Sequence, residues 1–145
     1  MFKKISRWKK FEEAPKDKII LAGVDSYDCG WVYDSIYWSV EHDCWLIAGT
    51  DEVCKPHMKY THFMELYEPN VRSNIRWLKS ARPPEKVYVV GGFDKDNSFK
   101  FSSVWYYEEQ KKFMLTGTIS STAAKLDFEP EFWCIPEKHK CEEAI

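Results

Sequence analysis

The chain resembles itself at a shift of about 68–70 residues, and this internal repeat limits its possible folds more than any other feature. The first copy spans about residues 7–69 and the second about residues 76–139. Because the segment between the copies is short, the copies must be neighbours in space. We therefore predict a first module at residues 1–70 and a second, diverged module at residues 71–145, which together form one compact unit. The matched pairs include Arg7-Trp8 with Arg76-Trp77, residues 19–23 with 88–92, residues 35–38 with 103–106, Trp45 with Phe113, Gly49-Thr50 with Gly117-Thr118, and residues 62–64 with 132–134.

Each copy has the pattern of several short strands joined by turns. Residues 19–24 and 87–90 are apolar and rich in β-branched side chains, as in a buried strand. An alternating strand, a charged turn and a further strand follow in both copies, which is the pattern of a β-hairpin. We expect a mainly β fold of two tandem antiparallel meanders packed as a pseudo-symmetric unit. Short helices at residues 1–10 and 71–80 would make the fold α+β, and the sequence leaves that alternative open.

The alternating strand carries apolar side chains on both faces, in a chain with 7 Trp, 8 Tyr and 9 Phe residues. One face, with Ile36 and Val104, must contact the core of its own module. The other face has two explanations: the modules pack against each other through it, or it forms an aromatic surface for a partner protein or a stacked base. The packing explanation needs no further assumption. The candidate binding residues are Trp31, Tyr33, Tyr37, Phe101 and Trp105.

The candidate catalytic and metal-binding groups form incomplete sets. His62 is the most attractive general base, but strand alternation places its neighbours Thr61 and Glu65 on the opposite side. Cys54 and His57 have the spacing of metal ligands, but the second ligand pair of a structural zinc site is missing. We therefore expect a protein that is not an enzyme and that uses no metal or cofactor. The acidic residues Asp25, Asp28, Asp34 and Asp43 are interpreted as exposed turn residues.

Charge and cysteine content indicate the compartment and the class of partner. The net charge is −2 and is spread evenly, so nucleic acid is not expected as a direct ligand. No apolar run approaches the ~20 residues of a membrane-spanning helix. The odd count of 5 Cys at irregular spacing is typical of reduced thiols. We expect a cytoplasmic protein, and a monomer is favoured because an internal repeat can replace a homodimer.

Residues 8–17, with the sequence Trp-Lys-Lys-Phe-Glu-Glu-Ala-Pro-Lys-Asp, resemble the opening of a small domain-of-unknown-function family that is frequent in bacteriophage and prophage genomes. Residues 61–69 begin with Thr-His-Phe-Met and are similar to the closing segment of that family. Lys18 and Phe63 depart from the Gly and Trp that the family usually has at these places. The resemblance covers the first copy well, and the second copy keeps less of it.

The resemblance implies a phage or mobile-element accessory protein, which would act in the cytoplasm of the host cell. By analogy, such a protein binds and inhibits or modulates a host protein, for example a defence factor, as anti-CRISPR proteins do, or a nucleic-acid-processing factor. Two alternatives stay open. One is a nucleotide binder or sponge that uses the cleft between the copies, and the other is a small enzyme that uses His62.

Overall fold

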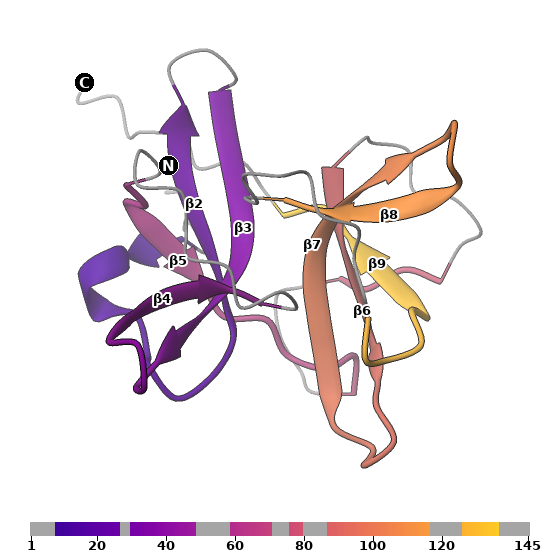
Figure 1. Cartoon of the computed structure of the whole chain (residues 1–145), viewed down its shortest axis with the longest axis horizontal. Helices are drawn as coiled ribbons and strands as arrows, with labels where there is room; N and C mark the ends of the chain where they lie inside the picture. Colours follow the sequence, from indigo (N-terminus) through magenta and orange to yellow (C-terminus); the bar gives the residue numbers. More distant parts are fainter. Residues whose placement is uncertain are drawn as a thin grey trace, which may run out of the picture.

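The computed structural model describes residues 8–26, 30–48, 59–70, 76–79, 87–116 and 126–136. These residues form two antiparallel β-sheets that lie side by side (Figure 1). The prediction of a mainly β fold built from two antiparallel modules is confirmed. No helix in the described ranges is long and apolar enough to cross a lipid bilayer.

The first sheet has five strands in the order β1-β5-β2-β3-β4, and the second has four in the order β8-β7-β6-β9. The strands of the first sheet are β1 (Lys9–Lys10), β2 (Ile20–Ser26), β3 (Gly30–Ser39), β4 (Cys44–Ile47) and β5 (His62–Met64). Those of the second sheet are β6 (Val87–Phe93), β7 (Phe99–Tyr107), β8 (Lys112–Leu115) and β9 (Phe132–Cys134).

The two predicted short helices are not found among the described residues. Lys9–Lys10 is strand β1, and Leu78 forms an isolated β-bridge with Trp133. Residues 1–7, 71–75 and 80, on which the rest of both predictions falls, lie outside the described residues. The helical geometry of the described chain is the 3₁₀ turn η1 (Phe11–Glu13).

The strand registers repeat between the sheets. Ser35 pairs with Leu21 in the first sheet, and Ser103 pairs with Val89 in the second. The predicted match of residues 19–23 with 88–92 is therefore wrong by one position, since it places Leu21 opposite Val90. A continuous apolar run has no landmark that fixes its register, whereas the serine of the next strand does.

The repeated tryptophans Trp8 and Trp77 have the same structural task. A Cβ atom on Gly23 would lie 3.0 Å from the Trp8 ring, and one on Gly91 would lie 3.1 Å from the Trp77 ring. Each tryptophan packs edge-on against the first aromatic residue of the long strand, with ring centroids 4.9 Å apart for Trp8–Trp31 and 5.2 Å apart for Trp77–Phe99. Both modules thus use a glycine to let two aromatic rings lie on the backbone of the central strand.

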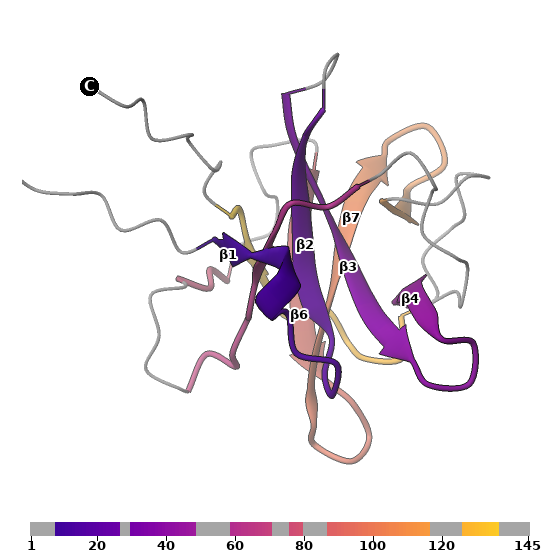
Figure 2. The ribbon, with the colours of Figure 1, turned by 90° about the vertical axis from the view of Figure 1, so that its left-hand side faces the viewer.

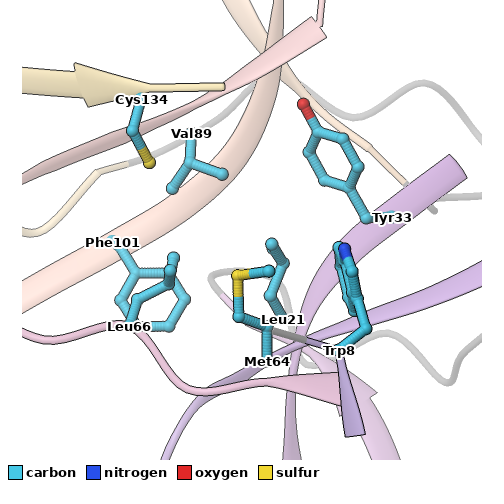
Figure 3. Packing of buried hydrophobic residues seen from close by; sticks show 8 residues of the cluster. All are labelled: Trp8, Leu21, Tyr33, Met64, Leu66, Val89, Phe101 and Cys134. Carbon is cyan, nitrogen blue, oxygen red and sulfur yellow. The ribbon is translucent and has the colours of Figure 1, made fainter. Parts of the chain in front are cut away.

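A central hydrophobic cluster takes side chains from both sheets (Figure 3). Each sheet also has a cluster on its outer face, which includes Ile36 in the first module and Val104 in the second, as predicted. The structure therefore has three packed layers of side chains and two sheets between them. The buried members of the central cluster are Trp8, Leu21, Tyr33, Met64, Leu66, Val89, Phe101 and Cys134.

Strands β3 and β7 run in opposite directions where the two sheets meet (Figures 1 and 2). The backbone N–H of Ser103 donates to Ser35 Oγ at 2.9 Å, and Ser103 Oγ donates to the carbonyl oxygen of Tyr33 at 3.3 Å. Thr116 Oγ1 lies 2.9 Å from Ser103 Oγ. We call this contact of Ser35, Ser103 and Thr116 the serine seam.

Candidate binding site

The five predicted binding residues do not form one surface. Tyr33 and Phe101 are 8% and 5% exposed and belong to the central cluster. The Tyr33 hydroxyl donates to the carbonyl oxygen of Val87 at 3.1 Å, so it joins the two modules. For these two residues the structure shows the packing alternative, and we no longer assign them to a partner surface.

The other three residues, Trp31, Tyr37 and Trp105, are half-buried at separate places. Trp31 packs on Trp8 and on the ring of His62. Tyr37 follows Ser35 by two residues, and Trp105 follows Ser103 by two residues. Because β3 and β7 run in opposite directions, Tyr37 and Trp105 lie on opposite sides of the serine seam. A shared aromatic surface made by both copies is therefore not formed.

Tyr37 lines a hollow of about 400 Å³ in the first module. This volume lies within the range of small ligand pockets. The hollow lies just before the start of β2. This strand begins at Ile20, which pairs with Ile36, whereas β3 continues to Ser39 and pairs there with β4 alone among the described strands. The residues that line it are Lys16, Asp17, Lys18, Ile19, Tyr37, Trp38 and Ala48.

Two lysines on the rim of the hollow have different surroundings. Lys18 Nζ lies 3.2 Å from Glu65 Oε1, and the Tyr67 hydroxyl donates to Glu65 Oε2 at 2.8 Å. The hydrogen bond from Tyr67, together with Lys18, lowers the pKa of the Glu65 carboxyl, and the bond to Glu65 raises the pKa of Lys18. Lys18 is therefore already neutralised by a carboxylate within the protein.

Lys16 has a different partner, which is an aromatic ring. Its Nζ lies 4.0 Å from the ring centroid of Trp38, the geometry of a cation–π contact. Lys16 forms no ion pair with any residue in the described ranges. The hollow thus combines an aromatic wall with one positive charge that no described carboxylate neutralises.

His62 lies on β5, and its surroundings differ from the prediction. Thr61 Oγ1 lies 2.8 Å from His62 Nδ1, so the expectation that alternation separates these two side chains is wrong. Thr61 precedes the strand, and its side chain is therefore not held to the alternation of strand residues. In the second sheet Phe132 takes the register position of His62, opposite Gly91.

The interpretation of Asp34 as an exposed turn residue is wrong. Asp34 lies in the middle of β3, is 2% exposed, and accepts a hydrogen bond from the Tyr60 hydroxyl at 2.6 Å. No local pattern around Asp34 indicates this burial, because Tyr60 comes from a segment 26 residues further along the chain. The second copy has a serine, Ser102, at the equivalent position.

Asp25 and Asp43 are exposed, as predicted. Asp43 lies in the turn between β3 and β4, whereas Asp25 lies in strand β2, opposite Trp31, and is not a turn residue. Asp28, Cys54 and His57 lie outside the described residues. In the part of the chain that the structure describes, no three His, Cys, Asp or Glu residues are grouped so that they could hold a metal ion.

Comparisons with known proteins give no relative: the chain matches no family model, no curated protein and no solved structure. The resemblance of residues 8–17 and 61–69 to a phage family therefore stays a prediction.

Proposed function

We propose that the protein is a non-enzymatic binding protein of phage or mobile-element origin that docks onto a host protein and inhibits or modulates it. The hollow at Tyr37 and Trp38 carries this proposal, because it joins an aromatic wall to the uncommitted charge of Lys16. Tyr and Trp side chains around a pocket are typical of the residues that contribute most binding energy in protein interfaces. The family resemblance supports a host protein as the partner.

The alternatives have weaker support. Side chains of the central cluster fill the contact between the modules, so a nucleotide has no described cleft there. A catalytic role for His62 would need an acid–base partner for the imidazole, and the Thr61 hydroxyl and the Trp31 ring, which lie next to it, are groups of other chemistry. A binding role requires neither feature.

A capture experiment with the full chain tests the proposal, and the repeat provides its control. Tyr37→Ala opens the wall of the hollow, and Trp105→Ala changes the repeat-equivalent position on the other side of the seam. We expect wild type and Trp105→Ala to capture one stoichiometric protein from bacterial extracts, and Tyr37→Ala to lose it. Thermal unfolding of both variants checks that each one is folded.

Two results would contradict the proposal. The first is that wild type captures no stoichiometric partner. The second is that folded Tyr37→Ala captures the partner as well as wild type does.

A further inference from the structure

The hollow borders a piece of strand backbone that has no described partner on the β2 side. The N–H of Ala48 donates to the carbonyl oxygen of Ser35 at 3.0 Å, so the odd-numbered residues of β3 direct their backbone groups toward β4. The even-numbered residues face β2, and Ile36 is the last one with a β2 partner. The N–H and C=O of Trp38 therefore face the space that β2 has left, and no backbone hydrogen bond joins them there to a described residue.

The same space holds the positive charge of Lys16, which no described carboxylate neutralises. Lys16 Nζ lies over the Trp38 ring, and a carboxylate would be a stronger partner for an ammonium group than a ring face is. Asp17 also lines the hollow, and Lys18 is paired with Glu65. The site thus offers one unpaired positive charge, beside one backbone donor and one backbone acceptor.

We propose that this site takes an extended acidic segment of the partner protein. The segment adds to the edge of β3 beside Trp38, places one apolar side chain against Ile19 and Tyr37, and places a carboxylate on Lys16. Strand addition of this kind obtains affinity from backbone hydrogen bonds and specificity from pockets for side chains. The inference rests on the proposed function and names the chemistry of its partner.

A peptide fits these groups better than a nucleotide does. A strand supplies an N–H and a C=O at the spacing that the Trp38 backbone requires. A nucleotide carries several phosphate charges, which the Asp17 carboxylate would repel and one free ammonium would not balance. A single carboxylate on a peptide matches the single free charge.

Titration with synthetic peptides tests the inference on the full chain. The probe is the acetylated, amidated peptide Ser-Thr-Leu-Asp-Thr, which carries a single carboxylate, and its comparison peptide has Lys in place of the Asp. We expect the acidic peptide to bind, with an affinity that falls as salt rises, and the basic peptide not to bind. Lys16→Gln should weaken binding about three- to fivefold, the effect of one exposed ion pair, whereas Lys10→Gln on β1 should leave it unchanged.

Strand addition has a signature that simple charge attraction lacks. We expect the bound peptide to slow hydrogen exchange at the Trp38 amide, while the Tyr37 amide, already within the β3–β4 ladder, changes little. Peptides with an N-methyl group at successive positions should lose affinity at every second position, because alternate residues of a strand pair with each neighbour.

Each other outcome overturns the inference. These outcomes are equal binding of acidic and basic peptides, no binding of either, uniform tolerance of N-methylation, or tighter binding of ATP than of the acidic peptide. If the capture experiment still yields a partner that depends on Tyr37, the proposed function stands and the acidic strand is wrong. If no partner is captured, the proposed function itself fails.

Discussion

Ser35 and Ser103 occupy the place where β3 and β7 meet, and their hydroxyl groups have different partners. Ser35 Oγ accepts the backbone N–H of Ser103, and Ser103 Oγ donates to the backbone carbonyl of Tyr33. Both serines are almost fully buried, at 1% and 0% exposed. A small hydroxyl residue lets two strands approach closely and still satisfies the polar groups that the approach buries.

Ser35→Ala removes the acceptor for a buried N–H group. We expect it to lower the free energy of unfolding by about 1–3 kcal/mol, the usual cost of an unsatisfied buried donor. Urea unfolding measures the loss. Ser98→Ala is the matched control. The described hydrogen bonds of Ser98 use its backbone N–H and C=O, and its side chain is exposed, so this variant should stay near wild type. Equal stability of Ser35→Ala and wild type would show that the seam bond is not needed.

Tyr88 predicts a loss of stability at alkaline pH. Burial raises the pKa of Tyr88 to about 12, with a further contribution from Tyr106. Because the pKa is higher in the folded state, the unfolded chain releases this proton first, near pH 10. The stabilisation is therefore complete below about pH 10 and is lost as the pH rises toward 12.

The variant Tyr88→Phe lacks this titration. Between pH 9 and pH 11, we expect the unfolding free energy of wild type to fall about 1 kcal/mol further than that of Tyr88→Phe. Urea unfolding across this range gives both curves. Parallel curves would mean that Tyr88 titrates alike in the folded and unfolded states.

At the scale of elements, β3 and β7 each serve two neighbours. They have 10 and 9 residues. Each pairs with the preceding strand over its first part, residues 30–36 of β3 and 99–105 of β7, and with the following strand at its end. The β6–β7 hairpin is closed by Asp94, whose Oδ1 accepts the N–H groups of Asp96 and Ser98 at 2.9 and 3.0 Å. Lys100 connects Asp94 to Asp127 in the segment that precedes β9.

Asp94→Ala should loosen this turn without unfolding the sheet. We expect faster hydrogen exchange at the amides of Asp96 and Ser98, and Asp94→Asn should retain most of the protection because its side-chain oxygen still accepts a bond. The hydrogen bond from Ser98 is the main cause that lowers the pKa of Asp94, so the turn is held at neutral pH and released as the pH falls below the ordinary range of an aspartate. Unchanged exchange in Asp94→Ala would contradict this role.

The repeat made most of the element pattern predictable from the sequence. Distinctive residues such as Ser35, Trp45 and His62 identified the equivalent positions in the second copy. The strand registers agree with these equivalences. Two features of the site were not predictable. The hollow depends on the residue at which pairing between β2 and β3 stops. The burial of Asp34 depends on Tyr60, which is distant in the sequence.

At the scale of the whole molecule, the two sheets share one core. The central cluster contains Leu21, Tyr33 and Met64 from the first sheet and Val89 and Phe101 from the second. Separation of the sheets would expose these side chains to water, at a cost of about 1.5–3 kcal/mol for each large apolar side chain. The modules are therefore expected to depend on each other for stability.

This dependence predicts the behaviour of the separate halves. We expect residues 1–70 and residues 71–145, produced alone, to lack cooperative unfolding as monomers, and to regain it when mixed. Circular dichroism with light scattering after size exclusion measures both properties. A half that unfolds cooperatively as a monomer, with the stability of the full chain, would disprove it.

The serine seam also has a genetic consequence. If two identical single modules met there, every substitution would enter both sides of the contact at once. In the tandem chain a mutation changes one side alone, and the differences are visible: Thr116 faces the seam where the first copy has Ala48, and Ser102 stands where the first copy has Asp34. One copy can thus change to form a hollow with its own lysine while the other copy keeps the residues of the shared core. Two identical modules could not diverge in this way, because both have the same sequence.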